Sequence, residues 1–163
     1  ALKGIDIAVR AFEKLPDKKL YVAGNGPMME EMQRYVREHH MENVKFLGYL
    51  QKDEMSEKFY QAKAVIMTSQ CYEAFAMTIA EAYSYGVPVI AGRVGNMDGM
   101  VQDGITGVKF TYNSAEDLAD KISAFDAMDL SVLKKNARAF YAERLRPEDN
   151  YQKLIRIYED ISK

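Results

Sequence analysis

The sequence lacks several features that define whole classes of protein. Cys71 is the only cysteine in 163 residues, so an internal disulfide is excluded, which fits a reducing compartment and hence a cytoplasmic location. No apolar run approaches the roughly 18 to 20 residues of a membrane span, and no signal peptide is visible. A net charge of −2 gives no electrostatic footprint for nucleic acid.

Metal-binding patterns and an initiator methionine are absent as well. No cluster of histidine, cysteine or aspartate has the spacing of metal ligands, so no metal and no cofactor is expected. The chain has no initiator methionine, and a helical pattern begins almost at Ala1. This start indicates a piece excised from a longer protein.

The composition that is present predicts one globular domain spanning residues 1–163. A chain of this length should bury about 70% of its unfolded surface. Its 48% of hydrophobic and 28% of charged residues are an ordinary globular balance.

Segments with strand and helix patterns alternate along most of the chain. Helices are expected at residues 4–15, 27–39, 52–62, 74–85, 115–125, 130–143 and 147–161. Strands are expected at residues 19–23, 44–49, 64–68, 88–91 and 108–110, with a glycine-rich stretch over 92–107. This alternation predicts an α/β fold, a Rossmann-like parallel sheet with right-handed crossovers and helices on both faces.

The last expected helix has an apolar stripe that needs a partner. Its stripe consists of Tyr151, Leu154, Ile155, Tyr158 and Ile161. Exposure of that stripe in an isolated chain would encourage self-association.

Ligands of open parallel sheets lie at the carboxyl ends of the strands. Four loops leave strand ends here and should line one crevice: residues 24–27, 48–50, 69–73 and 92–95. Helix amino termini at that edge offer N–H groups and a positive dipole end to phosphate. The best-placed amides are those of Ala74, Phe75, Ala76, Met77 and Thr78.

Two carboxylates mark the segment 72–92. Glu73 stands just ahead of the expected helix and Glu81 lies two turns inside it. Helical spacing sets the two side chains about 12 Å apart along the axis and roughly 80° apart around it. A glycosidase pair lies about 5 to 9.5 Å apart, so that role fits poorly. One elongated ligand with an anionic middle, such as a nucleotide sugar, fits better.

The segment resembles the E-x7-E signature of the family-4 (group 1) retaining glycosyltransferases. Further pieces of the family pattern follow in order: Lys3-Gly4, Leu20 to Pro27, Asn43 to Tyr49, Gly86 to Ala91 and Asp103 to Gly107. The similarity covers about Leu2 to Phe110 and implies the C-terminal, donor-binding domain of a GT-B enzyme. That domain transfers a sugar from a nucleotide-diphosphate sugar to an acceptor bound by a separate N-terminal domain.

The resemblance implies a role for each matching residue. Glu73 would bind donor-sugar hydroxyls, Glu81 the ribose hydroxyls, and Lys3 would neutralise the leaving diphosphate. The amides of residues 75–78 would hold phosphate and sugar, beside the loop of Gly24 and Gly26. Tyr49 would lie near the base. The helix 147–163 would contact the missing domain.

The sequence departs from the family pattern in three places. Ala76 replaces a glycine, and Gly99 stands where a glutamate is frequent. The family's phosphate-binding arginine and first central strand would lie before Lys3. In the family's proposed route the departing phosphate takes the acceptor proton, and no convincing general base is visible here.

Several alternatives remain open. Glu73 and Glu81 could be a capping acid and a solvated helix carboxylate, and Lys3 a surface lysine. The protein could instead be a GT-B nucleotide-sugar epimerase or a non-catalytic nucleotide- or sugar-binding module. The acceptor, a sugar or a lipid-linked glycan, is not defined, nor is a membrane association of the full-length protein.

Overall fold

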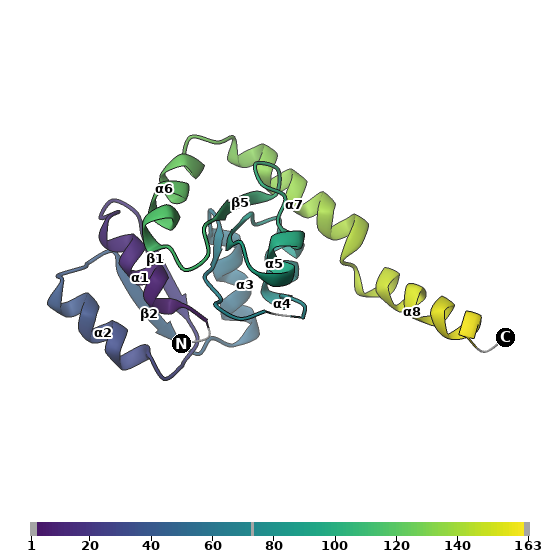
Figure 1. The fold of residues 1–163 in the computed structure, drawn as a ribbon, viewed down its shortest axis with the longest axis horizontal. Helices are drawn as coiled ribbons and strands as arrows, with labels where there is room; N and C mark the ends of the chain where they lie inside the picture. The colour runs from purple at the N-terminus through teal and green to yellow at the C-terminus, as the bar shows by residue number, and fades with distance from the viewer. Residues whose placement is uncertain (1–2, 73, 162–163) are drawn as a thin grey trace.

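The computed structural model describes residues 3–72 and 74–161. Strands and helices alternate through the first two thirds of the chain, and three helices follow (Figure 1). The strands are β1 (Leu20–Ala23), β2 (Val44–Gly48), β3 (Val65–Met67), β4 (Val89–Gly92) and β5 (Gly107–Phe110). The helices are α1 (Ile5–Glu13), α2 (Met29–Glu38), α3 (Lys52–Gln61), α4 (Met77–Ser84), α5 (Gly95–Met100), α6 (Ala115–Phe125), α7 (Leu130–Arg144) and α8 (Pro147–Ile161).

The predicted α/β class is confirmed, and local capping explains where the best-predicted helices begin. The Ser114 hydroxyl accepts a hydrogen bond from the Asp117 amide at the start of α6. The Asp129 carboxylate accepts from two amides at the start of α7. Gln51 and Glu54 form a reciprocal capping box at the start of α3. Such caps satisfy donors that a helix start leaves without partners.

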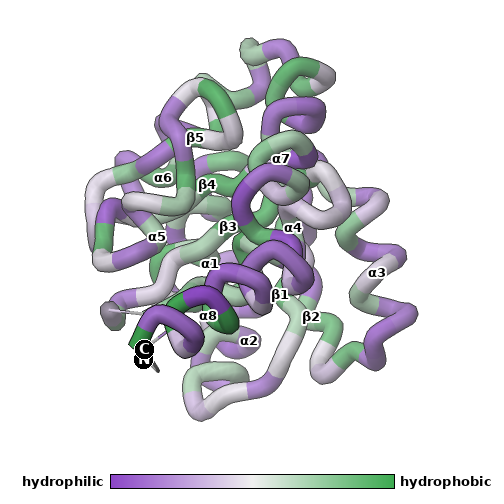
Figure 2. The backbone as a smooth tube through the Cα atoms, turned by 90° about the vertical axis from the view of Figure 1, so that its right-hand side faces the viewer, coloured by the Kyte–Doolittle hydropathy of each residue, from purple (hydrophilic) through white to green (hydrophobic). Residues whose placement is uncertain are grey.

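The strands form two parallel sheets rather than one. In the described residues β1 pairs with β2, and β4 pairs with both β3 and β5. Figure 2 shows β3, β4 and β5 side by side, with β1 and β2 below them. The split separates the chain's first strand pair from its three-stranded sheet, and helices bridge the two.

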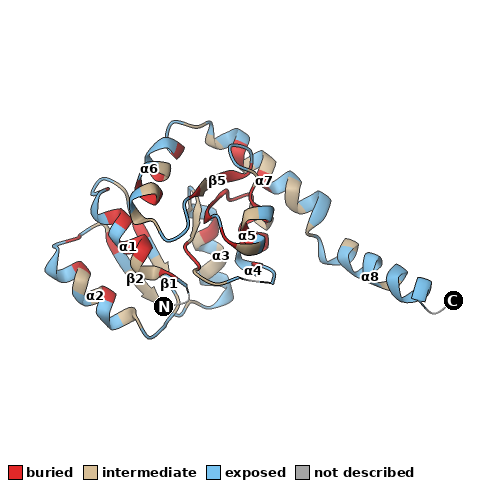
Figure 3. Ribbon diagram, viewed as in Figure 1, coloured by how far each residue is buried: buried red, intermediate tan, exposed pale blue. Residues whose placement is uncertain are grey.

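A buried cluster of apolar side chains packs on each face of β4. All four residues of this strand are buried (Figure 3). Ile90 points into the cluster that contains α1 and α6 residues, whereas Val89 and Ala91 point into the cluster of α4 and α7 residues. This alternation is the period-2 geometry of a strand covered on both faces.

Helix α8 extends away from the rest of the molecule (Figure 1). None of its described residues is buried (Figure 3). Tyr151, Leu154, Tyr158 and Ile161 of the predicted stripe are exposed, and Ile155 is half-buried. Within residues 3–72 and 74–161, no helix is both long and apolar enough to cross a membrane.

A substitution of Gly107 would test how closely β4 and β5 pack in the three-stranded sheet. A Cβ atom at this position would lie 1.8 Å from the carbonyl oxygen of Val89, a backbone atom that cannot move without disturbing the β4–β5 pairing. We expect Gly107→Ala to lower the free energy of unfolding by about 1 to 3 kcal/mol, measured by urea denaturation.

Gly99→Ala is the matched control for this substitution. Gly99 lies in α5, and nothing lies within 4 Å of an added Cβ. The helix should therefore gain about 0.5 to 1 kcal/mol from the alanine. Equal effects of the two substitutions would contradict the steric explanation.

Candidate functional site

One cleft of about 1040 Å³ opens at the carboxyl ends of β1 and β3 and continues between the two sheets. Its lining at the strand ends comes from the amino end of the chain, the loops after β1 and β3, and helix α4. These lining residues are Lys3, Gly4, Gly24, Asn25, Gly26, Pro27, Thr68, Ser69, Thr78 and Glu81. The cleft thus lies where the ligands of open α/β sheets bind.

The structure brings some of the predicted site residues together and not others. Five of them line the cleft, namely Lys3, Gly24, Gly26, Thr78 and Glu81. Five others do not, namely Tyr49, Ala74, Phe75, Ala76 and Met77. Glu73 lies outside the described residues, so its predicted position beside the cleft is untested.

The predicted site residues that do not line the cleft differ in their exposure to solvent. Tyr49 follows β2, and its residue surface is 72% exposed. Phe75 and Met77 are also exposed, whereas Ala76 is fully buried in the apolar cluster around α4. Of residues 74–78 only Thr78 lines the cleft, and the Met77 amide donates to the carbonyl oxygen of Phe75 over 3.0 Å.

Helix α4 begins at Met77, three residues later than the sequence predicts. Its N-cap, Ala76, has φ −80° and ψ 80° and provides no side-chain hydrogen bond to the helix. The Asn96 side-chain amide donates to the carbonyl oxygen of Ala74, which lies ahead of the helix. Hence only Met77 and Thr78 of the five predicted amides belong to the helix start.

The Lys3–Gly4 segment is held at the carboxyl end of β3. The Thr68 hydroxyl donates a 2.9 Å hydrogen bond to the Lys3 carbonyl oxygen. Gly4 has φ 63°, and a Cβ there would lie 2.1 Å from the Thr68 carbonyl oxygen. Only glycine permits this close approach with a left-handed backbone. The contact places exposed Lys3 at the mouth of the cleft.

The loop after β1 forms the opposite wall of the cleft. Gly24 adopts φ 108°, which favours glycine, and its amide donates to the carbonyl oxygen of Gly48 over 2.6 Å. Asn25, Gly26 and Pro27 then continue along the cleft toward α2. Gly24 therefore has a definite conformational role in this loop.

Glu81 is an exposed carboxylate on the side of α4 that faces the cleft. No hydrogen bond or ion pair joins this carboxylate to another residue in the described part of the chain. An exposed anion without a protein partner can accept hydrogen bonds from ligand hydroxyls, because it keeps its full acceptor capacity.

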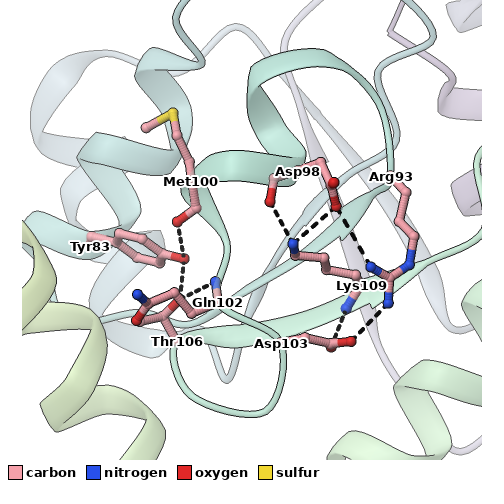
Figure 4. Close-up of polar contacts among 8 residues, drawn as sticks. All are labelled: Tyr83, Arg93, Asp98, Met100, Gln102, Asp103, Thr106 and Lys109. Carbon is pink, nitrogen blue, oxygen red and sulfur yellow. Dashed lines mark hydrogen bonds and ion pairs between the residues drawn. The ribbon is translucent and has the colours of Figure 1, made fainter.

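The loop after β4 does not line the cleft, contrary to the prediction for residues 92–95. It is held instead by an ion-pair network (Figure 4). Arg93 donates to the Asp103 carboxylate over 2.8 Å, and Lys109 lies 3.0 Å from the Asp98 carboxylate. Asp103 also accepts from the Lys109 amide over 2.9 Å. These pairs tie the loop and α5 to β5 and the turn before it.

Helix α5 and this network are absent from the sequence prediction. A signal was available, because Val94, Met97, Met100 and Val101 are apolar, have helical spacing and are buried. Gly95 and Gly99 made this helical pattern difficult to recognise, because glycine is unfavourable inside a helix. Within the described residues, no group of three or more His, Cys, Asp or Glu side chains could hold a metal ion.

A second polar network joins Tyr83 of α4 to Thr106 and Gln102. Tyr83 is fully buried, and its hydroxyl lies 2.7 Å from the Thr106 hydroxyl (Figure 4). Thr106 also accepts from the Gln102 amide over 3.0 Å. Burial raises the pKa of the Tyr83 phenol to about 12. The network connects the helix that carries Glu81 to the turn before β5.

The profile of the family "Glycosyl transferases group 1" matches residues 1–138. The chain belongs to the group 1 glycosyl transferases, as the resemblance implied.

Two curated relatives and one solved structure illustrate the similarity. Sulfoquinovosyl transferase SQD2 of Arabidopsis thaliana is 29% identical over 141 residues, which cover 83% of this chain and 27% of SQD2. N-acetyl-alpha-D-glucosaminyl L-malate synthase of Bacillus anthracis is 28% identical over 98% of this chain and 42% of its own length. Alr3699/HepE of Anabaena, crystallised with UDP, superposes with a TM-score of 0.88 at 23% identity.

The HepE superposition shows the shared fold and covers 98% of this chain but 46% of HepE. This chain therefore spans less than half the length of each of these three proteins. The GT-B fold class expected for the chain is confirmed, as one half of that fold.

The Tyr83 network predicts a pH dependence of stability. Because the folded-state pKa of Tyr83 lies near 12 and the usual value is 10, the unfolded chain ionises first. The stability from the buried neutral phenol is complete below about pH 10 and falls as the pH rises toward 12.

Tyr83→Phe removes this titration together with a buried hydrogen bond worth about 1 kcal/mol. We expect the stability of the wild-type chain relative to the variant to fall steadily from pH 10 to pH 12, measured by urea unfolding. A constant difference across that range would contradict the burial of an ionisable phenol.

Proposed function

We propose that this chain is the donor-binding domain of a retaining glycosyltransferase. The full protein would transfer a sugar from a nucleotide-diphosphate sugar to an acceptor held by a separate N-terminal domain. The observation that carries the proposal is the meeting of Lys3, the start of α4 and Glu81 along one open cleft. Membership of the glycosyl transferases supports the reaction class.

The distribution of charge along the cleft suits a nucleotide diphosphate. The start of α4 contributes a positive dipole end and amides without intrahelical partners. Lys3 at the cleft mouth adds a cation, and Glu81 lies one turn further along the helix. A diphosphate near the helix start would then have its ribose within reach of the Glu81 carboxylate. HepE, a structure with the same fold, binds UDP.

The donor sugar belongs at the other end of the bound nucleotide. Glu73, three residues before the N-cap of α4, is proposed to accept hydrogen bonds from the sugar hydroxyls. Tyr49 lies outside the cleft and is 72% exposed, so its proposed contact with the base is through the backbone of the loop after β2.

Charge stabilisation is the main chemical task of this site. As the bond between the sugar and the phosphate breaks, negative charge develops on the departing diphosphate. Lys3 and the first amides of α4 would stabilise that charge at fixed positions, without reorganisation during the reaction. The departing phosphate would take the acceptor proton, so the chain needs no separate general base.

Binding of the acceptor is assigned to a second domain. Helix α8 leaves the body of the molecule with four apolar stripe residues exposed, and we propose that this stripe packs on that domain. The acceptor would be a sugar or a lipid-linked glycan. This proposal accounts for the chain's coverage of less than half of its relatives.

Nucleotide binding by this chain alone is the direct test of the proposal. We expect isothermal titration calorimetry with UDP, GDP and ADP to show at least one dissociation constant in the micromolar-to-millimolar range. The affinity should be modest, because a separate domain would contribute the rest of the closed site. A folded chain that binds none of the three would overturn the assignment.

The two carboxylates should have separable effects. Glu81→Ala should weaken nucleotide binding by about 1.5 to 3 kcal/mol, because a charged acceptor for the ribose is lost. Glu73→Ala should leave nucleotide binding nearly unchanged and reduce turnover of the sugar donor by the longer enzyme. Calorimetry and a transfer assay measure the two effects.

Glu42→Ala is the matched control for both. Glu42 is exposed, precedes β2 and does not line the cleft. Its loss should change neither binding nor turnover. Equal losses from Glu73→Ala and Glu81→Ala would mean that the ligand lies in the reverse direction.

A further inference from the structure

The loop between β3 and α4, residues 68–76, carries Glu73. It is buried where it leaves the sheet, at Thr68, and exposed at Tyr72 and Ala74. Ordering an exposed loop costs conformational entropy, so a carboxylate on it keeps one position only where other contacts hold its neighbours. The residues on either side of Glu73 have such contacts.

Asn96, the second residue of α5, holds the residue that follows Glu73. Its side-chain amide donates a hydrogen bond to the carbonyl oxygen of Ala74, 22 residues earlier in the chain. Both residues are exposed. The bond therefore links α5 to the β3–α4 loop and adds nothing to the hydrogen-bonding ladder of a helix or sheet.

Gly95 lets α5 approach the residue that precedes Glu73. It has φ 53°, and a Cβ atom there would lie 3.1 Å from Cδ1 and 3.3 Å from Cα of Tyr72. Only a residue without a side chain fits so close to Tyr72 with a left-handed backbone. The start of α5 thus lies against Tyr72 and is bonded to Ala74.

The loop after β5 holds the same β3–α4 loop nearer to β3. The Tyr112 hydroxyl donates to the carbonyl oxygen of Gln70 over 3.0 Å. The Gln70 side-chain amide donates to the Asn113 side-chain oxygen, also over 3.0 Å. Contacts from the segments after β4 and β5 therefore hold residues 70, 72 and 74.

Helix α5 gives Asn96 a fixed support. Its next residue, Met97, is fully buried in the apolar cluster around α4. The Asp98 carboxylate lies 3.0 Å from the Lys109 ammonium of β5 (Figure 4). Because the residues after Asn96 are fixed to the core and to β5, its amide can hold Ala74 in one place.

We propose that Asn96 is a positioning residue of the donor site, which acts through Ala74 to hold Glu73 where it meets the donor-sugar hydroxyls. This role rests on the proposed function, which assigns Glu73 to those hydroxyls. A carboxylate that is already in place spares the sugar an ordering cost on binding. Asn96 therefore strengthens binding of the sugar and leaves the nucleotide contacts of Thr78 and Glu81, on α4, unchanged.

Asn96→Asp removes the bond with little disturbance of the fold. The carboxylate keeps the size of the side chain, cannot donate to the Ala74 carbonyl oxygen, and is favourable at the positive start of a helix. A second variant, Asn96→Ala, also lacks the donor and adds no charge. Both should therefore have the same effect on ligand binding.

Calorimetry on this chain measures that effect. The nucleotide that binds, among UDP, GDP and ADP, would be compared with its conjugates to glucose, galactose, mannose and N-acetylglucosamine. Either Asn96 variant should bind the nucleotide within about twofold of the wild-type affinity. Each should bind the preferred nucleotide sugar about 3- to 10-fold more weakly, the loss expected for one hydrogen bond.

A double-mutant cycle with Glu73→Ala separates positioning from a general structural effect. If Asn96 acts through Glu73, Asn96→Asp should not weaken nucleotide-sugar binding further once Glu73 is alanine. A purely structural role would give additive losses in the double variant.

Asn136→Asp is the matched control. The Asn136 side chain, on α7, donates to the carbonyl oxygen of Ile105 over 3.2 Å and does not line the cleft. The same substitution there should change the affinity for neither ligand. Urea unfolding of all variants should give the wild-type midpoint, because both bonds are exposed.

The possible failures are distinguishable. Unchanged nucleotide-sugar affinity in the Asn96 variants, equal weakening of nucleotide and nucleotide sugar, or additive losses in the cycle would overturn the role of Asn96 alone. So would a wild-type chain whose affinity rises with none of the four sugars. A folded chain that binds none of the three nucleotides would instead overturn the proposed function, and this role with it.

Discussion

The parallel pairing of β4 with β3 and β5 is the constraint on which the rest of the structure depends. β4 is buried on both faces, and Gly107 lets β5 approach the Val89 backbone. Parallel strands bring their carboxyl ends to one edge of the sheet. That edge therefore collects the start of α4, the Lys3 segment and the α5 loop. The position of the cleft follows from strand direction before any side chain is considered.

Helices and charges, rather than strands, join the two sheets of the described chain. Helix α1 packs against α6, and Gly4 lies against Thr68 at one end of the gap. Asp126 bridges Lys18 and Lys63 at the other end. The residues of the candidate site are thus divided between the segments that follow the strands of the two sheets. Gly24 and Gly26 lie in the loop after β1 of the smaller sheet, whereas Thr78 and Glu81 lie on α4, which follows β3 of the larger sheet.

Local signals could be predicted from the sequence, and contacts between distant segments could not. The bounds of α6 and α8 were predicted to the residue, because Ser114 caps one helix and Pro147 begins the other. The start of α4 was predicted three residues early, because the alanines at 74 and 76 favour a helix locally, whereas in the structure Ala74 is hydrogen-bonded to the distant Asn96 and Ala76 is the N-cap. The split of the sheet depends on pairing across the whole domain, which no local pattern contains. In the site, glycine positions and Glu81 followed from motifs, whereas Thr68 required the fold.

The N-cap of helix α4 is Ala76, whose side chain has no group that could cap the helix. A side-chain cap normally adds about 1 kcal/mol to a helix, and α4 lacks that contribution. An anion bound at this end would act as the missing cap, so occupancy of the cleft and the order of the first helical turn are thermodynamically linked. By that linkage, any change that frays the start of α4 weakens the ligand, and any ligand that reaches these amides stiffens the helix.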